Sequence, residues 1–416
     1  MCICVVKIES ASAPKAAGPQ AEAQEWPFSN RALTLENNIL REILKVTDIP
    51  GVISFAGGMP APELFPYEGL FEAARTLLEG RDGNALQYSL SRGTHELRKW
   101  LIEYCPSTVP LTEEDVLVTS GAQQALDIVG RAFLERGDRV LTSHPTYVGL
   151  IHSFNFYGAD MVTCRTDEQG LDPDAVEKEL KRKSAKLIYL VATYDNPTGR
   201  TQPLERRKRL MEIAAHYGVP VIDDNPYAEL SYRGAPPPSL RLLDPEWALE
   251  LKTFSKMISP GLRIGWMIAP RQYMGIFEKV KQSTDLHTNT FCQRLIHLFC
   301  TSGKLEPHVA KLCKAYSARL DCMLAALEEH MPEGITWTKP DGGLFLWVML
   351  PEHLDAEPLL KAAVAEKVAF VPGRPFYPKA DSGSAFRLNF SNQPEDKIRD
   401  GIGRLGRILR KQRLTA

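Results

Sequence analysis

The chain has 416 residues, and its 50 Lys and Arg nearly balance its 51 Asp and Glu, giving a formal net charge of −1. Nucleic acids and anionic membrane surfaces are bound through clustered Lys and Arg, so this balance argues against either partner. Hydrophobic residues make up 44% of the chain and charged residues 24%, and its apolar runs are too short to span a membrane, which indicates a globular protein of two or three domains.

Cysteine use and the start of the chain bear on the compartment. Eight cysteines are too dilute for a disulfide scaffold, and most stand singly among apolar residues, as small core side chains do. The opening apolar run is shorter than a signal-peptide core, and charged residues follow it, so we expect a cytoplasmic protein. No metal site is predicted, because Cys2 and Cys4 lack a second pair, and residues 1–30 are predicted to be a disordered lead.

From about residue 95 the chain alternates between helical and strand-like patterns. Strands rich in Val, Ile and Leu, separated by amphipathic helices, are typical of a largely parallel sheet covered by helices on both faces. The elements predicted here are, in chain order, a helix over 95–104, a strand over 115–119, a helix over 122–135, strands over 139–142 and 186–191, a helix over 204–217, and strands over 219–223, 248–252 and 262–268.

After about residue 300 the pattern changes to one long helix followed by separated strands. The elements predicted for this part are a helix over 307–330, strands over 344–348, 368–371 and 386–390, and a final helix from about residue 394. The sequence therefore predicts an α/β protein with a large and a small α+β domain. The predicted boundaries are a segment over 31–56 that joins the small domain, a large cofactor-binding domain over 57–300, and the small domain over 301–416.

Ligands of a parallel sheet bind beyond the carboxyl ends of its strands, so the chemistry is expected at those ends. After the 115–119 strand, residues 120–123 open a helix, whose unpaired N–H groups and positive end suit a phosphate. After the 186–191 strand, Asn196 in an Asn-Pro-Thr-Gly turn brings an amide to the same edge.

Two further strand ends carry ionisable side chains. Asp223 and Asp224 end the 219–223 strand, and a pair of carboxylates at this edge is more than a helix cap requires. Lys256 follows two hydroxyl residues and precedes Arg263 between apolar strands. A lysine in such surroundings can lose its proton and act as a nucleophile or imine former.

A phosphate cradle, an amide, an acid and a lysine at adjacent strand ends match the needs of pyridoxal 5′-phosphate. Its aldehyde forms an imine with lysine, and its pyridinium nitrogen needs an acidic partner to make the ring an electron sink. A nicotinamide enzyme would need a Gly-x-Gly-x-x-Gly turn early in the sheet, and a P-loop enzyme a Gly-x4-Gly-Lys-Ser/Thr turn. Neither stands there.

Seven motifs occur in an order and spacing that chance explains poorly: ISFAGGMP at 53–60, LQYS at 86–89, TSGAQQ at 119–124, NPTG at 196–199, DDNPY at 223–227, SK at 255–256 with PGLR at 260–263, and FRLNFS at 386–391. From about Arg31 to the C-terminus the chain resembles the fold-type I, class I/II aminotransferases. Within them it is most similar to the 2-aminoadipate/kynurenine aminotransferase-like group.

This resemblance implies a fold of type I, pyridoxal 5′-phosphate as cofactor, and three catalytic residues. Lys256 would hold the cofactor and then move the substrate proton. Asp224 would pair with the pyridinium nitrogen, and Tyr147 would stack on the ring. The further cofactor-binding residues that it implies are Ala122, Gln123, Asn196, Tyr227, Thr253, Ser255 and Arg263, with Tyr88 reaching the phosphate of the partner subunit.

The resemblance also implies a homodimer whose sites lie at the interface, and a substrate pocket. Arg387 would clamp the substrate α-carboxylate in a two-pronged pair, near Asn196. The segment of Gly57 and Gly58 would line this pocket. Arg41 matches the position where relatives place a mobile arginine, which either pairs with acidic substrates or stays in solvent.

We therefore predict an aminotransferase that moves an amino group from an α-amino acid of the 2-aminoadipate, aromatic or branched-chain type to a 2-oxo acid such as 2-oxoglutarate, in a ping-pong cycle. Three other interpretations stay open. The same scaffold supports β-elimination, and it occurs in regulators behind a basic DNA-binding domain, for which the net charge gives no support. A pseudoenzyme is disfavoured by intact Lys256, Asp224 and Arg387.

Overall fold

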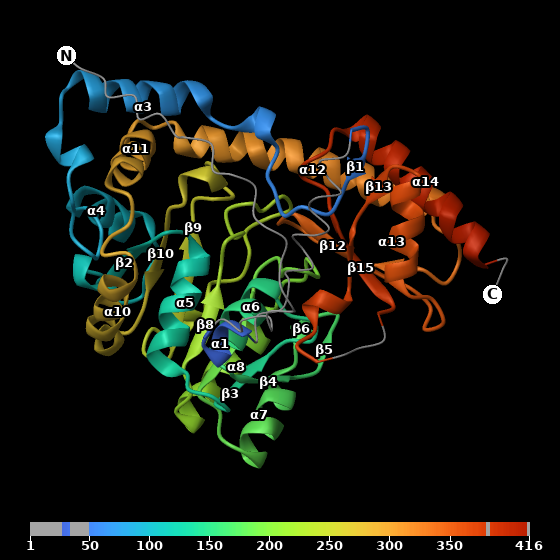
Figure 1. The fold of residues 1–416 in the computed structure, drawn as a ribbon, viewed down its shortest axis with the longest axis horizontal. Helices are drawn as coiled ribbons and strands as arrows, with labels where there is room; N and C mark the ends of the chain where they lie inside the picture. Colours follow the sequence, from blue (N-terminus) through green and yellow to red (C-terminus); the bar gives the residue numbers. More distant parts are fainter. Residues whose placement is uncertain (1–26, 34–49, 380–382, 414–416) are drawn as a thin grey trace, which may run out of the picture.

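A central sheet of seven strands organises the computed structural model, which describes residues 27–33, 50–379 and 383–413 (Figure 1). All strands run parallel except β10, which is antiparallel to both of its neighbours. Their order across the sheet is β2 (Val116–Thr119), β10 (Gly265–Ile268), β9 (Ala248–Thr253), β8 (Val221–Asp224), β7 (Leu187–Leu190), β3 (Arg139–Thr142) and β4 (Asp160–Thr163).

Helices cover both faces of this sheet, because successive strand residues point to opposite faces and both faces are apolar. Tyr189 and Ile222 belong to the core under one set of helices, whereas Ile188 and Val221 belong to the core under another. The first set is α5 (Ala122–Phe133), α6 (Val148–Phe156) and α10 (Arg271–Thr284). The second set is α7 (Pro173–Arg182), α8 (Leu204–Tyr217) and α9 (Leu240–Leu243). Two further helices, α4 (His95–Tyr104) and α11 (Thr290–Thr301), pack near β2 and β10.

A second, antiparallel sheet lies beside the first, on the right in Figure 1. Its strand order is β11 (Thr336–Trp337), β12 (Phe345–Met349), β15 (Ala385–Asn389) and β14 (Val371–Pro372). The long helix α12 (Leu305–His330) runs along the top of the molecule toward it and packs against α14 (Glu395–Arg413). Near the start of the described chain, β1 (Ile53–Ser54) pairs in parallel with β13 (Val368–Ala369). The predicted domain boundaries stay a prediction, and most of the predicted disordered lead lies outside the described residues.

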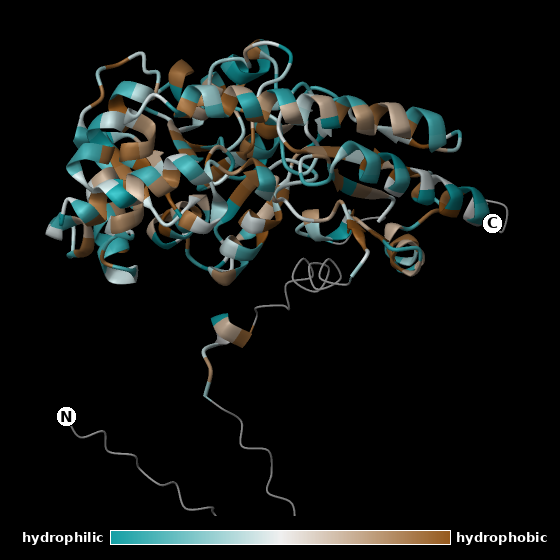
Figure 2. Cartoon of the chain, turned by 90° about the horizontal axis from the view of Figure 1, so that it is seen from above, coloured by the Kyte–Doolittle hydropathy of each residue, from teal (hydrophilic) through white to brown (hydrophobic). Residues whose placement is uncertain are grey.

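The remaining elements are short or peripheral. They are α1 (Asn30–Leu33), α3 (Tyr67–Glu79), α13 (Ala356–Ala365), the two-stranded β5 (Thr166–Asp167) and β6 (Gly170–Leu171), and the 3-10 turns η1 (Pro62–Leu64), η2 (Gly83–Leu86), η3 (Glu113–Asp115), η4 (Pro260–Leu262) and η5 (Arg374–Phe376). Seen from above, hydrophobic segments lie between helices whose outer turns are hydrophilic (Figure 2). None of the helices in the described part of the chain could cross a membrane.

The predicted α/β class with a mostly parallel central sheet is confirmed. The predicted bounds of two strands are wrong. The strand predicted over 262–268 begins only at Gly265, because residues 260–262 form η4 and Arg263 adopts a left-handed conformation with φ of 54°. The strand predicted over 368–371 is divided between two sheets, since β13 pairs with β1 and β14 pairs with β15.

Candidate active site

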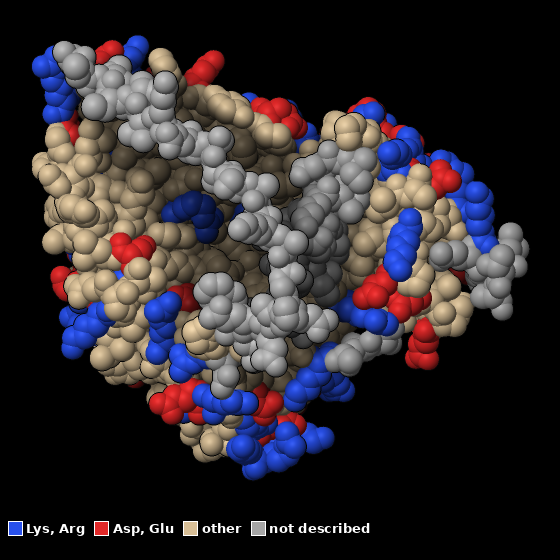
Figure 3. Space-filling model, viewed as in Figure 1, with Lys and Arg blue, Asp and Glu red and all other residues tan. Residues whose placement is uncertain are grey.

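A cavity of about 250 Å³ lies at the carboxyl edge of the central sheet. Figure 3 shows this face hollowed, with Lys or Arg atoms at the floor of the hollow. Because parallel strands end at one edge, residues far apart in sequence meet there. The predicted site residues that line the cavity are Gly58, Ala122, Gln123, Tyr147, Asn196, Asp224, Tyr227, Thr253, Ser255, Lys256, Arg263 and Arg387; Val148, Val191, Pro226, Pro260 and Phe345 complete the lining.

Lys256 follows β9 by three residues, and its side chain extends into this cavity. Its Nζ donates a hydrogen bond to the carbonyl oxygen of Gly58 at 2.7 Å. Burial lowers the pKa of Lys256 to about 8, and the nearby charges of Arg387 and Arg263 act in the same direction. With this pKa about one amine in ten is unprotonated at pH 7, and the unprotonated amine is the form that acts as a nucleophile or general base.

Asp224 ends β8, and strand alternation separates it from Asp223. Asp223 points to the other face, where its Oδ2 accepts a hydrogen bond from the backbone N–H of Leu240 at 2.8 Å. Asp224 Oδ2 accepts one from the Tyr189 hydroxyl at 2.7 Å, whereas its Oδ1 is buried without a partner. Burial raises the pKa of Asp224 to about 7; the Tyr189 hydrogen bond opposes this effect and the Asp223 charge adds to it.

Tyr189 is a residue that the sequence analysis missed. It lies in the middle of β7, is fully buried, and is paired in register with Ile222 of β8, two residues before Asp224. Strand alternation places Ile222 on the same face as Asp224, but only the observed register of β7 and β8 brings Tyr189 to that face. Its hydroxyl bonds one oxygen of the carboxylate, and the other oxygen is buried without a hydrogen-bond partner among the described residues.

Arg387 reaches the cavity from β15 of the second sheet. Its Nη1 donates to Asn196 Oδ1 at 2.8 Å and its Nη2 to the carbonyl oxygen of Ala56 at 2.7 Å. The guanidinium carbon lies 4.2 Å from the Phe345 ring centre and 5.1 Å from that of Phe376. Burial lowers the pKa of Arg387 to about 10, so it stays a cation, held between rings and suited to a carboxylate.

The amide of Asn196 joins this arginine to Tyr227. Its Nδ2 donates to the Tyr227 hydroxyl at 3.3 Å, and both side chains are buried. Burial raises the pKa of Tyr147 to about 12 and that of Tyr227 further, so both phenols stay protonated at neutral pH. The two phenols and the amide therefore offer neutral hydrogen-bonding groups beside Lys256.

The turn between β2 and α5 forms a cradle for an anion. Gly121 has φ of 82°, and a Cβ at this position would lie 2.5 Å from Arg263 Nη2. That same nitrogen donates to the carbonyl oxygen of Ser120 at 3.0 Å. The N–H groups of Ala122 and Gln123, in the first turn of α5, have no acceptor within the helix. The hydroxyls of Thr253 and Ser255, 2.9 Å apart, complete the lining.

Two predicted site residues, Tyr88 and Gly57, do not line this cavity, and a third is not described. Tyr88 is 79% exposed and makes an edge contact with the ring of His287, with centroids 5.7 Å apart. Gly57 is buried next to Gly58 and does not line the cavity. Arg41 lies outside the described residues.

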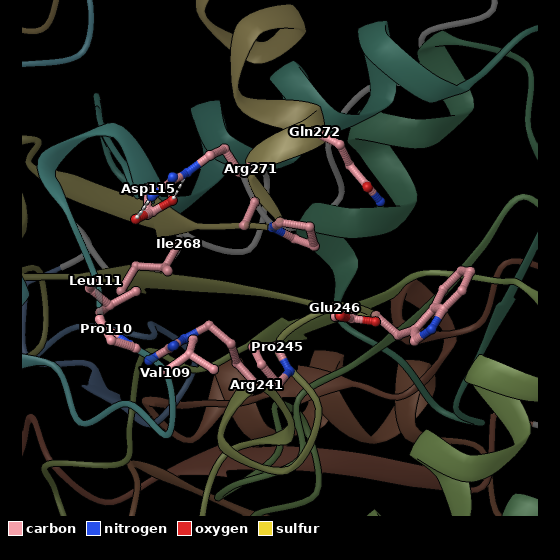
Figure 4. Close-up of a pocket in the computed structure, with 13 residues that line it drawn as sticks. Val109, Pro110, Leu111, Asp115, Arg241, Pro245, Glu246, Ile268, Arg271 and Gln272 are labelled. Atoms are coloured by element: carbon pink, nitrogen blue, oxygen red, sulfur yellow. Dashed lines mark hydrogen bonds and ion pairs between the residues drawn. The ribbon is translucent and has the colours of Figure 1, made fainter.

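A larger cavity of about 530 Å³ lies at the opposite edge of the sheet, between Leu111, Pro245 and Ile268 (Figure 4). Its cations are already paired. Arg241 bonds the buried Glu250 at 3.0 Å, and Arg271 bonds Asp115 at 3.0 Å across the edge shown in Figure 4. The cations of the smaller cavity, Lys256, Arg263 and Arg387, bond carbonyl and amide oxygens and not carboxylates. These cations and the N-terminus of α5 suit a phosphate.

The residues of the smaller cavity fit pyridoxal 5′-phosphate. The unpartnered Asp224 Oδ1 is placed to accept from a pyridinium N–H, and the Gly121 turn would be filled by any Cβ. Lys256 supplies a partly deprotonated amine. No group of three or more His, Cys, Asp or Glu that could hold a metal ion occurs among the described residues.

The pattern of the family described as "Aminotransferase class I and II" matches residues 63–405. The chain belongs to this family. Such class I/II aminotransferases use pyridoxal 5′-phosphate, so the predicted family, enzyme class and cofactor are confirmed. Two relatives named as uncharacterized HTH-type transcriptional regulators, of Bacillus subtilis and Escherichia coli, are 27% and 26% identical over 90% of this chain, so the family match alone does not decide against the regulator interpretation.

Several class I/II aminotransferases match this chain over nearly its whole length. Aromatic-amino-acid aminotransferase 1 of Thermococcus litoralis is 40% identical over 98% of this chain and 99% of its own. A solved kynurenine aminotransferase of Pyrococcus horikoshii has a TM-score of 0.89 and 40% identity, covering 93% and 97%. LysN, the α-aminoadipate aminotransferase of Thermus thermophilus solved with N-(5′-phosphopyridoxyl)-L-leucine, has a TM-score of 0.88 and 37% identity, covering 94% and 98%. The predicted type I fold is confirmed by these neighbours.

Proposed function

We propose that the cavity around Lys256 is the active site of an α-amino acid:2-oxo acid aminotransferase working in a ping-pong cycle. The observation that carries this proposal is that three side chains line one cavity: Lys256, Asp224 and Arg387. One oxygen of Asp224 has no hydrogen-bond partner among the described residues, and the Arg387 guanidinium lies over the Phe345 ring. When bound, pyridoxal 5′-phosphate supplies an electron sink for charge that develops at the substrate Cα. The side chains bind, orient and move protons around that sink.

Each residue has a part that follows from its position. Arg387 binds the substrate α-carboxylate through its two terminal nitrogens and thereby orients the Cα–H bond. The Lys256 amine would take the proton from the substrate Cα and deliver it to the C4′ carbon of the cofactor, and would move it in the opposite direction in the second half of the cycle. Asp224 holds the proton of the pyridinium nitrogen through Oδ1.

The phosphate would be held by the α5 N-terminus with Thr253, Ser255 and Arg263. Tyr147 would lie against the cofactor ring, and Asn196 with Tyr227 would hydrogen-bond its phenolic oxygen. Phe345 packs its ring edge on Tyr227, with centroids 5.9 Å apart, and helps to keep water from this side of the cavity.

We propose aromatic, branched-chain and 2-aminoadipate substrates, because related enzymes are named for aromatic amino acids, kynurenine and α-aminoadipate, and the last was solved with a phosphopyridoxyl derivative of leucine. Phe345, Tyr227 and Val148 offer apolar surface to an uncharged side chain. The cations among the described lining residues are Lys256, Arg263 and Arg387, and each already has a part. An acidic side chain would therefore draw on a further cation, for which Arg41 stays the proposed candidate.

We further propose a homodimer that works in the cytoplasm in amino-acid biosynthesis. Large apolar side chains are exposed between residues 67 and 90: Tyr67, Phe71 and Leu78 on α3, and Leu86, Tyr88 and Leu90 after it. Together they make a patch suited to a second copy of the chain. The cysteines of the described chain are all unpaired, which suits a reducing compartment.

Half-reaction absorbance tests the activity. We expect single amino acids to convert the parent enzyme from its pyridoxal to its pyridoxamine spectrum, and a 2-oxo acid to restore it. Lys256→Ala should lack the parent's pH-dependent visible band and its turnover. No spectral conversion with any α-amino acid, or ordinary turnover by Lys256→Ala, would contradict the proposal. Release of pyruvate from a β-substituted amino acid without an acceptor would instead favour the β-eliminating lyase.

A further inference from the structure

Lys281 is a fully buried lysine that the reaction described above does not use. It lies near the end of α10, outside the active-site cavity, and its side chain has no exposed surface. Its Nζ donates to Asp285 Oδ1, to Gln124 Oε1 and to Thr288 Oγ1, each at 2.9 Å. An ammonium has three protons, so its bonding capacity is fully used.

Two of these acceptors, Gln124 and Asp285, also bond Ser120 in the β2–α5 turn that forms the cradle. Gln124 Oε1 accepts the backbone N–H of Ser120 at 2.7 Å, and Asp285 Oδ2 accepts the Ser120 hydroxyl at 3.1 Å. Gln124 and Asp285 are themselves joined at 2.6 Å. Since Arg263 binds the Ser120 carbonyl oxygen, this one residue is held at its N–H, its side chain and its C=O.

The position of Ser120 determines the geometry of the cradle. Gly121 follows it in a left-handed conformation, and the free N–H groups of α5 begin at Ala122. A rotation of the peptide at Ser120 would move its carbonyl oxygen, which Arg263 bonds, and the N–H groups that follow it. Both would then point away from the proposed phosphate position. Burying a lysine costs free energy that only good partners offset, and two of its partners here, Gln124 and Asp285, bond Ser120 of the cradle turn.

We propose that Lys281 and Asp285 are positioning residues that fix the Ser120–Gly121 turn for the cofactor phosphate. They act from behind the cradle and make no contact with the cofactor. The inference rests on the proposed placement of the phosphate at this cradle. It predicts that the network serves binding of the phosphate group and not of the pyridine ring.

Cofactor selectivity of the full chain, freed of its cofactor, tests this inference. The affinity for pyridoxal 5′-phosphate is compared with that for pyridoxal, which lacks the phosphate. We expect Lys281→Met to lower the ratio of the two affinities by about tenfold or more, the worth of one charge-assisted hydrogen bond, with pyridoxal affinity changed less than twofold. Asp285→Asn keeps the shape of its side chain and should lower the ratio in the same direction.

Arg241→Met is the matched control, because Arg241 is also buried in an ion pair, with Glu250, at the opposite edge of the sheet. It should lower thermal stability and leave the affinity ratio unchanged. If Lys281→Met fails to fold, Asp285→Asn decides. A parental ratio in the folded Lys281 and Asp285 variants, or an equal loss in Arg241→Met, would overturn the inference. A parent that itself shows no preference for the phosphorylated form would contradict the proposed function instead.

Discussion

At the scale of single residues, the surroundings of Lys256 determine when its amine is free. Burial and the Arg387 and Arg263 charges lower its pKa to about 8, below the ordinary 10.5. In the cofactor-free protein we expect acetylation of Lys256 by acetic anhydride, followed by mass spectrometry, to rise with pH with a midpoint near 8. The same peptide in denaturant should give a midpoint above 10. Equal midpoints in both states would contradict the lowered pKa.

The same shift gives stability a pH dependence of known sign. Between pH 8 and 10.5 the unfolded chain carries a proton on Lys256 that the folded chain has lost, so unfolding takes up a proton. This residue therefore makes the free energy of unfolding rise with pH in that window. Below pH 8, Lys256→Met without cofactor should be more stable than the parent in urea titrations. A less stable variant there would oppose this sign.

Tyr189 gives a second prediction at this scale. Removing its hydroxyl with Tyr189→Phe leaves Asp224 Oδ2 without its 2.7 Å donor in a buried site. A hydrogen bond to a charged group contributes about 1.5–3 kcal/mol, so we expect kcat to fall between about tenfold and a hundredfold. The cofactor's visible band should also titrate at a different pH. Steady-state kinetics and absorbance titration measure both effects.

Tyr157→Phe is the control for this change, since it also removes a tyrosine–aspartate hydrogen bond, to Asp127 between α5 and α6. It should affect stability and leave kcat unchanged. Parental kcat and titration in Tyr189→Phe would show that the Asp224 carboxylate needs no such support.

At the scale of elements, the β2–α5 turn depends on Gly121. An alanine there has to adopt φ of 82°, and its Cβ would meet the end of Arg263 at 2.5 Å, so the arginine has to leave the cradle. We expect Gly121→Ala to weaken binding of pyridoxal 5′-phosphate by more than tenfold, as measured by titration of the cofactor-free protein. Gly137→Ala shares the positive φ, at 87°, but has open space around it. It should cost stability only, and an equal loss of affinity in both variants would show a general backbone effect.

How far the sequence could predict these elements depends on how local their signals are. The strand at 187–190 is a continuous apolar run, and a parallel sheet binds its ligands beyond the strand ends, so Asn196 after this strand could be placed at the site, as could Lys256 after the strand at 248–253. The strand β4 was missed, because it lies at the sheet edge with only Met161 buried and carries polar residues at both ends.

Other contacts depend on register, which a single sequence does not contain. Tyr189 meets Asp224 because β7 and β8 pair as Tyr189 to Ile222. Lys281 bonds Gln124 because the packing of α10 against α5 brings these two residues side by side, and a single sequence does not show how two helices are aligned. The placement of Arg387 was predicted only through the resemblance of residues 386–391 to a family, since no local pattern says which sheet faces the cavity.

At the scale of the whole molecule, the site joins two sheets. Arg387 comes from the second sheet, and its guanidinium bonds Asn196 in the turn that follows β7 of the first sheet. Lys256 meanwhile bonds the carbonyl oxygen of Gly58, in the segment that follows β1. Relative movement of the sheets would therefore change the distance between the group that binds the carboxylate and the group that moves the proton. The position of a substrate bound by Arg387 relative to Lys256 thus depends on how the two sheets are placed.

The proposed dimer gives the last prediction, because it assigns Tyr88 to the neighbouring active site. In this chain Tyr88 is 79% exposed and lies outside the cavity that holds Lys256. Two inactive or weakened variants, Lys256→Ala and Tyr88→Ala, should therefore complement each other when unfolded together and refolded. In a mixed dimer one site has both substitutions, and the other has an intact Lys256 and an intact Tyr88. With random pairing, half of the dimers are mixed and about a quarter of all sites are intact, so the activity should exceed the sum of the separate variants by about a quarter of the difference between the parent and Tyr88→Ala. Activity equal to that sum would place Tyr88 outside the partner's site, and a chain that sediments as a monomer would contradict the dimer itself.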